Sequence, residues 1–228
     1  MKVKLIVVLG ILLLVSQVGA QEKLVLKDQK DKISYIIGMD IGNNLKKQSI
    51  SVNPKILAKG IEDALSGAKH LLAEQEVQET MMAFQKEMMA KQAEVAKKNK
   101  TEGEAFLAEN KKKEGVKTLP SGVQYKVMKA GNGKKPKSND TVAVHYRGTL
   151  IDGTEFDSSY KRGQPATLQV SGVIPGWTEA LQLMVEGAKW QLFIPSNLAY
   201  CERGAGGVIG PNATLIFEVE LISIQEKK

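Results

Sequence analysis

The chain has 228 residues, enough for one large domain or two small ones, and its 43% hydrophobic and 25% charged residues are typical of a globular protein. The net charge of +7 comes from lysines that are spread along the chain or grouped in a helical pattern, which indicates a solvated face, so we expect no nucleic-acid partner. Cys201 is the only cysteine, which excludes an internal disulfide framework.

Residues 1–20 have the pattern of a secretory signal peptide. Lys2 and Lys4 precede an apolar stretch that is too short for a comfortable membrane span, and small residues end with Ala20 at a cleavage site. We therefore expect an exported protein with no stable membrane span after cleavage. The periplasm is the expected location, with the outer membrane or the cell surface as alternatives.

Residues 21–72 are expected to form a helical dimerisation domain. Gly38 and Gly42 would let another helix approach closely, and Asn53 followed by Pro54 is typical of a helix start, with Gly67 at the end of that helix. Two helices this short bury too little surface to be stable alone, so we expect a homodimer through these helices. Their first apolar stripe consists of Ile33, Ile37, Ile41 and Leu45.

Residues 73–114 form one long helical pattern that is polar and rich in lysine and glutamate. A helix of ~40 residues spans roughly 60 Å, and one this polar is not buried, so it is expected to be a stalk. Thr101 to Glu104 could be a capping box that restarts the helix, or a weak point at Gly103, and both interpretations stay open.

Residues 115–228 have a different pattern, in which apolar residues alternate with other residues. Val142, Val144 and Tyr146 are one such set, which predicts a half-buried strand. Asp152-Gly153 indicates a tight hairpin turn, and one short helix is expected from Pro175 to Gly187. The predicted fold class is therefore α+β, with an antiparallel sheet wrapped on one short helix, preceded by the all-α domain and the stalk helix.

The sequence contains none of the usual catalytic arrangements. It has no metal-ligand spacing, no phosphate loop and no nucleophile paired with a base, and its two histidines, His70 and His145, lie in different domains. We therefore expect a function that uses neither a metal nor another cofactor.

Four motifs in the C-terminal domain closely resemble the FKBP-type peptidyl-prolyl cis/trans isomerases: VHYRG from Val144, DGTEFDSS from Asp152, VIPGW from Val173 and ATLIF from Ala213. The helical half is similar to the partner domain of the macrophage infectivity potentiator group, through SYIIGMDIG from Ser34. The order and spacing of the motifs fit across nearly the whole mature chain.

This resemblance implies an enzyme that isomerises Xaa-Pro bonds in unfolded or partly folded proteins and that macrolides of the rapamycin type inhibit. Taken singly, most of the residues involved would more often be core or turn residues. The implied catalytic residues are Asp157, Tyr200, Phe156 and Phe217. The implied substrate-binding residues are Tyr146, Val173, Ile174, Trp177 and Ile209, with Trp177 as the floor of the proline pocket.

Three departures from the family pattern concern the site. Ala166 stands where many members have an aromatic residue, which predicts a shallower wall, and Cys201 stands where glycine is usual. The stretch from Gln169 to Gly172 is short compared with single-domain relatives, which could alter macrolide contacts. A different function is a dimeric chaperone or binding module for unfolded chains, with isomerisation secondary. Its support is the methionine-rich stalk, which includes Met81, Met82, Met88 and Met89.

Overall fold

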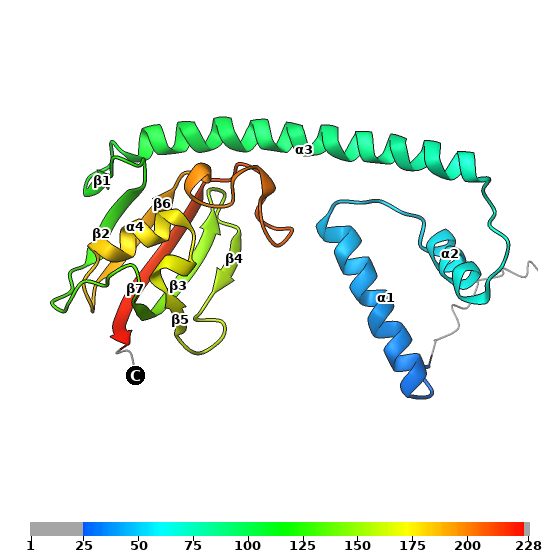
Figure 1. Cartoon of the computed structure of the whole chain (residues 1–228), viewed down its shortest axis with the longest axis horizontal. Helices are drawn as coiled ribbons and strands as arrows, with labels where there is room; N and C mark the ends of the chain where they lie inside the picture. The colour runs from blue at the N-terminus through cyan, green and yellow to red at the C-terminus, as the bar shows by residue number, and fades with distance from the viewer. Residues whose placement is uncertain (1–24, 226–228) are drawn as a thin grey trace, which may run out of the picture. The chain divides into compact units, whose positions relative to one another are not determined.

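The computed structural model describes residues 25–225, so the predicted signal peptide at residues 1–20 lies outside the described part. The chain divides into two compact units between Lys46 and Lys47. Within residues 25–225, no helix is both long and apolar enough to cross a membrane. The three N-terminal helices, labelled in Figure 1, are α1 (Gln29–Lys47), α2 (Pro54–Ser66) and α3 (Glu74–Asn110).

The helices α1 and α2 form as the sequence predicts, but neither contains a buried residue. Asn53 caps α2 by accepting a hydrogen bond from Lys55 N at 3.0 Å, and Gly67 ends it in the left-handed region at φ 67°. The apolar stripes remain open to solvent in the single chain: the Ile37 side chain is 54% exposed and Leu65 is 85% exposed.

The helix α3 is continuous from Glu74 to Asn110 and passes through Gly103 without a break (Figure 1). At its start the Glu76 carboxylate accepts a hydrogen bond from Ala73 N at 2.8 Å. The helix therefore does not restart at Thr101. Gly103 is buried because it faces Thr214, where a β-carbon on Gly103 would overlap the Thr214 hydroxyl oxygen.

The C-terminal half is an antiparallel sheet with strand order β1-β2-β6-β7-β3-β4, and β5 also pairs with β3. The long strands β3 and β7 pair along their whole length, with a bulge between Ala143 and Val144. The predicted turn at Asp152-Gly153 joins β3 to β4. The strands are β1 (Val116–Thr118), β2 (Gln124–Lys129), β3 (Thr141–Leu150), β4 (Glu155–Ser158), β5 (Ala166–Gln169), β6 (Lys189–Ile194) and β7 (Leu215–Gln225).

The helix α4 (Pro175–Leu183) packs on one face of this sheet, which confirms the predicted α+β class. Three short 3-10 helices complete the domain: η1 (Val170–Gly172), η2 (Ser196–Leu198) and η3 (Cys201–Arg203). The prediction that α4 extends to Gly187 was wrong. Its backbone becomes extended at Met184, whose side chain is fully buried, and Gly187 instead belongs to the turn before β6, at φ 83°.

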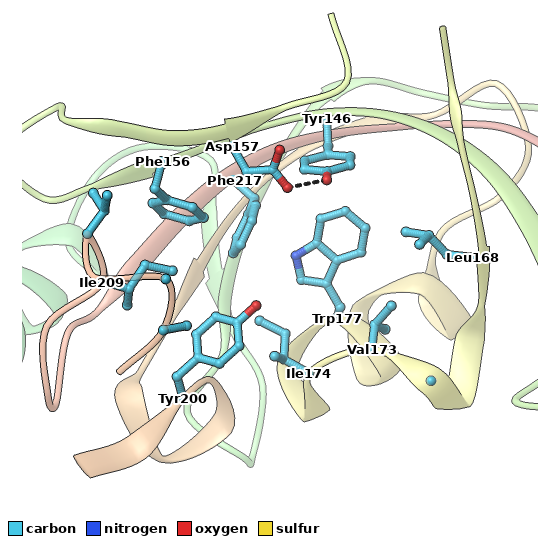
Figure 2. Close-up of a pocket in the computed structure, with 14 residues that line it drawn as sticks. Tyr146, Phe156, Asp157, Leu168, Val173, Ile174, Trp177, Tyr200, Ile209 and Phe217 are labelled. Atoms are coloured by element: carbon cyan, nitrogen blue, oxygen red, sulfur yellow. Dashed lines mark hydrogen bonds between the residues drawn. The ribbon is translucent and has the colours of Figure 1, made fainter. Parts of the chain in front are cut away.

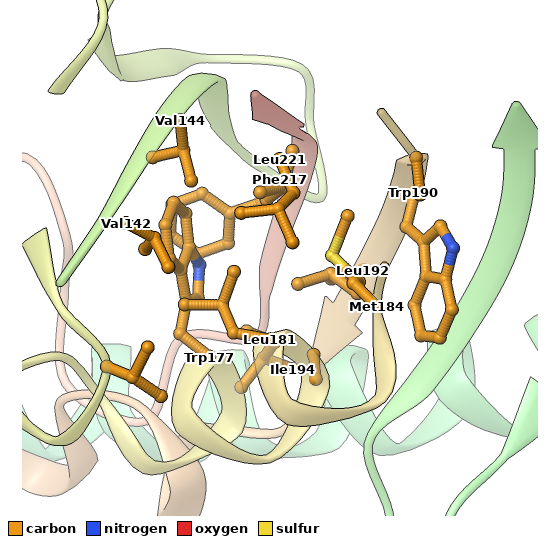
Figure 3. Packing of buried hydrophobic residues seen from close by; sticks show 14 of the residues in the cluster. Val142, Val144, Trp177, Leu181, Met184, Trp190, Leu192, Ile194, Phe217 and Leu221 are labelled. Carbon is orange, nitrogen blue, oxygen red and sulfur yellow. The ribbon is translucent and has the colours of Figure 1, made fainter. Parts of the chain in front are cut away.

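Figure 3 shows the core between α4 and the sheet. Leu181 and Met184 from the helical side meet Leu192 from β6, and all three are fully buried. The alternating residues Leu215, Phe217, Val219 and Leu221 of β7 supply the opposite side, as the period-two pattern predicts. The domain therefore has one contiguous core, which holds the walls of the site described below.

Candidate active site

The described residues enclose a cavity of about 600 Å³ at one end of this core (Figure 2). Four strands (β3, β4, β5 and β7), the segment before α4, α4 itself and the loop of residues 199–213, which we call the 199–213 loop, all contribute to its wall. The cavity brings together all nine residues that the family resemblance implied. The lining residues are Tyr146, Phe156, Asp157, Leu168, Gly172, Val173, Ile174, Trp177, Tyr200, Ala205, Gly206, Val208, Ile209 and Phe217.

The inner end of the cavity is aromatic. Trp177 is only 4% exposed, and its ring meets the rings of Tyr146 and Phe217 edge to face, with centroids 5.3 and 5.2 Å apart. Phe156 continues the series against Phe217 at 5.4 Å. Because perpendicular pairs place a positive ring edge on a negative ring face, each ring fixes the orientation of the next. The Trp177 indole nitrogen is buried and has no hydrogen-bond partner among the described residues.

Gly148 on β3 makes room for this aromatic series. A β-carbon at this position would lie 2.6 Å from Phe156 Cε2 and 2.8 Å from Phe217 Cε1, closer than real side chains come. The absence of a side chain therefore lets the two phenylalanine rings close one side of the pocket. Replacing Gly148 would push them into the cavity or away from β3.

The polar edge of the cavity is a network of Tyr146, Asp157 and Arg162. The Tyr146 hydroxyl donates a hydrogen bond to Asp157, and Arg162 donates to Asp157 and, from Nη2, to Tyr146 Oη at 2.7 Å. The guanidinium also lies 5.3 Å above the centre of the Tyr146 ring. Partial burial raises the pKa of Asp157, but the hydrogen bonds from Tyr146 and Arg162 outweigh it, and the pKa is lowered overall.

Burial, followed by the hydrogen bond to Asp157, raises the pKa of Tyr146 above its ordinary value. Tyr146 therefore keeps its proton and Asp157 its charge at neutral pH. Each of the two groups therefore has its hydrogen-bond partners inside the network, which holds both side chains at the edge of the cavity.

Two of the three departures from the family pattern, Ala166 and Cys201, lie outside the cavity wall, whereas Gly172, at the end of the short stretch from Gln169, lines it. Ala166 packs against the core, and Leu168, two residues further along β5, lines the cavity. Cys201 is exposed, and its thiol lies 3.7 Å from Asn197 O. On this side of the cavity the β5 residue in the wall is therefore Leu168 and not Ala166, so Ala166 does not make the wall shallower.

Sequence reasoning did not find Leu168, Val208 or Arg162. Leu168 lies in a strand of only four residues, too short for a clear alternation. Val208 lies in a glycine-rich loop and Arg162 in a turn, where no periodicity marks a side chain as facing a site. Arg162 follows Asp157 by five residues, and only the folded turn brings the two charges together.

The comparisons with known proteins identify the family of the chain. Residues 132–222 match the family described as FKBP-type peptidyl-prolyl cis-trans isomerase, and residues 30–127 match the domain amino terminal to such isomerases. The chain is 51% identical to the outer membrane protein MIP of Legionella longbeachae over 99% of both chains. It is 46% identical to the peptidyl-prolyl cis-trans isomerase Mip of Coxiella burnetii, over 89% of this chain and 90% of that one.

Among solved structures, FkpA from Escherichia coli is similar with a TM-score of 0.63 and 40% identity, over 88% of this chain and 99% of that chain. A peptidyl-prolyl cis-trans isomerase from Pseudomonas syringae is similar over 57% of this chain and 96% of that one, with 43% identity and a TM-score of 0.54. Both halves of the chain are thus matched, the second by the catalytic family itself. The chain belongs to the FKBP-type peptidyl-prolyl cis/trans isomerases and is an enzyme of that family.

Proposed function

We propose that this isomerase assists the folding of exported proteins and that the aromatic cavity is where it binds and twists the Xaa-Pro bond. The observation that carries the proposal is the convergence of nine family-implied side chains on one mostly apolar cavity. In this site Trp177 is the floor under the proline ring, and Val173, Ile209 and Tyr146 are its walls. Phe156 and Phe217 face the twisting amide.

The chemistry requires no bond to break. Rotation about a peptide bond has a barrier of about 18–20 kcal/mol because twisting removes amide resonance, and an Xaa-Pro bond exchanges unaided over tens to hundreds of seconds. A catalyst need only bind the twisted amide better than either planar form. The twisted amide is less polarised than the planar one, so a cavity with an aromatic floor and little water favours it.

Three polar groups would orient the substrate. Tyr200, whose side chain is 38% exposed at the rim, would donate its hydroxyl to one substrate carbonyl. The backbone N–H of Ile174, the residue before α4, would bond a second carbonyl. Asp157 could face the carbonyl carbon of the twisting amide or orient neighbouring side chains, and its hydrogen bonds with Tyr146 and Arg162 support the second role.

The test is the cis-to-trans rate of a short leucyl-prolyl peptide, with and without the mature protein, repeated with rapamycin. We expect acceleration that rapamycin abolishes. A folded protein that gives no acceleration would contradict the proposal. Acceleration that rapamycin leaves unchanged would place the activity outside this cavity.

The N-terminal helices are proposed to make the protein a homodimer. Large apolar side chains of α1 and of α2 are open to solvent in the single chain, and Tyr35, Ile36, Ile37 and Ile56 are each exposed over more than half of their surface. Exposed apolar patches on a helix mark sites of contact with another protein. The proposed organisation is a signal peptide at 1–20, a dimerisation domain at 21–72, a stalk at 73–114 and the isomerase domain at 115–228. Light scattering that gives a monomer at micromolar concentration would contradict it.

A second candidate function, binding of unfolded chains, is supported by one further feature. Met81, Met82, Phe84 and Met88 of α3 line a groove of about 540 Å³ together with Ile50. Methionine side chains adapt to apolar partners of varied shape. Suppression of aggregation by residues 21–113 alone would favour a chaperone role for the helices. Suppression by the full chain only would favour the isomerase domain.

Export to the periplasm is proposed from the signal-peptide pattern of residues 1–20. One of the similar proteins supports it, since the relative from Legionella longbeachae is named an outer membrane protein. Cell fractionation of the expressed full chain tests this. Recovery of the uncleaved chain in the cytoplasm would contradict it.

A further inference from the structure

We infer that Asn99, in the stalk helix α3, is a positioning residue for the active site, because it holds the loop that forms one wall of the cavity. The side-chain amide of Asn99 donates a hydrogen bond to Pro211 O at 2.8 Å, across 112 positions of sequence. The 199–213 loop ends two residues after Pro211. This inference rests on the proposed function of the cavity, because it concerns the wall of that site.

The loop supplies more of the cavity than any other segment. Five lining residues come from it: Tyr200, Ala205, Gly206, Val208 and Ile209. Apart from the short helix η3, its internal order comes from a few backbone bonds, such as Asn212 N to Cys201 O at 2.8 Å and the pair between Ala205 and Ile209 at 2.8 and 3.0 Å. No strand of the sheet pairs with it among the described residues.

The loop's backbone conformation is also unusual. Cys201 and Asn212 have φ values of 52° and 55°, in the left-handed region where side chains are disfavoured. Gly204, Gly206 and Gly207 have positive φ as well. A chain with this many left-handed positions and few internal bonds keeps one shape only if its surroundings hold it.

The surroundings that hold it belong to α3. A β-carbon on Gly210 would lie 3.0 Å from Asn99 Nδ2 and 3.4 Å from Val95 Cγ1, so the helix surface touches the loop backbone directly. Figure 1 shows the loop, in orange, beside the C-terminal half of α3. Asn99 donates its hydrogen bond to the carbonyl of Pro211, two residues after Ile209. The Ile209 side chain is only 8% exposed. Loss of this bond therefore frees the wall that carries Tyr200 and Ile209.

The test compares two matched changes of amide to carboxylate in the full chain. Asn99→Asp keeps the size of the side chain and places an acceptor against Pro211 O. Gln92→Glu makes the same change two turns earlier on α3, at an exposed position. We expect Asn99→Asp to lower kcat/KM for the leucyl-prolyl peptide about three- to tenfold, the range for one hydrogen bond. We expect Gln92→Glu to leave it unchanged.

Two further readouts separate positioning from general stability. Because the wall contacts the planar and the twisted peptide alike, KM is expected to rise more than kcat falls, and rapamycin binding to weaken in parallel. In an Ile209→Ala background, which already removes part of the wall, the effect of Asn99→Asp is expected to shrink below about twofold. If Asn99→Asp does not fold, Asn99→Ala removes the donor without adding repulsion, and about a threefold loss is expected.

An Asn99 effect that is fully additive with Ile209→Ala, or no effect of either Asn99 variant on kcat/KM and rapamycin binding, would overturn the inference. The proposed function has a separate outcome. If the wild-type chain gives no rapamycin-sensitive acceleration, the cavity is not the site, whatever Asn99 does. If the wild-type chain is active and Asn99→Asp matches Gln92→Glu, only the positioning role is wrong.

Discussion

Gly103→Ala is expected to destabilise the isomerase domain even though alanine is the better helix former. Alanine is favoured over glycine by about 1 kcal/mol inside a helix. Here the added methyl group would overlap Thr214 Oγ1 and lie 3.2 Å from Thr214 Cβ, and Thr214 is 5% exposed, so it cannot easily move away. Forcing an extra carbon into a packed contact costs about 1–3 kcal/mol. The balance is a loss of about 1 kcal/mol in the free energy of unfolding.

Urea unfolding followed by tryptophan fluorescence measures this change. The chain has two tryptophans, Trp177 and Trp190, and both lie in the sheet domain, so the signal reports that domain. The control is a double-mutant cycle with Thr214→Ala, which removes the overlapping oxygen and is expected to make Gly103→Ala about neutral. If Gly103→Ala stabilises the protein while the wild-type threonine is kept at position 214, α3 is not packed on the domain as described.

Three other results are expected. Burial raises the pKa of Asp157, but its hydrogen bonds lower it more, so the folded-state pKa lies below the unfolded-state pKa of about 3.9. The network therefore stabilises the fold at pH values above the unfolded-state pKa, and this stability is lost as the pH falls through the folded-state pKa. Activity should thus be constant from about pH 5 to 8, and a titration in that range that Asp157→Asn removes would contradict this. Tyr200→Phe should lower kcat/KM by about tenfold at most, with urea unfolding almost unchanged, because this hydroxyl lies at the exposed rim. An unchanged kcat/KM would remove Tyr200 from the mechanism. Ile37→Glu, on the open stripe of α1, should give monomers in light scattering and leave the peptide isomerase activity per chain unchanged; a persistent dimer would place the interface elsewhere.

The parts of this structure that could be predicted from sequence are those with a local pattern. The alternation along β7 and the cap and proline at Asn53 and Pro54 predict their elements because each depends on neighbours in the chain. Nine of the lining residues came from the family resemblance, since no periodicity would have separated Trp177 or Phe217 from ordinary core residues.

The contacts that the sequence did not reveal join distant segments. The sequence leaves open whether Gly103 belongs to a capping box or is a weak point, because its partner, Thr214, is more than a hundred residues away. Asn99 looked like any other polar residue of a solvated helix, and only the folded chain brings its amide to Pro211 O. A polar side chain on a polar helix carries no local signal of a tertiary hydrogen bond.

The chemistry explains why such distant contacts matter for this enzyme. Because isomerisation breaks no bond, the site has no reactive group whose presence alone supplies the rate, and catalysis depends on how well the cavity holds its shape around the twisted amide. Each 1.36 kcal/mol of lost complementarity costs a factor of ten. A hydrogen bond that fixes a wall, as Asn99 does for the 199–213 loop, is therefore expected to change kcat/KM about as much as a polar group at the rim such as Tyr200, mainly through KM. In this proposal the helix α3 is part of the active-site framework along its final turns.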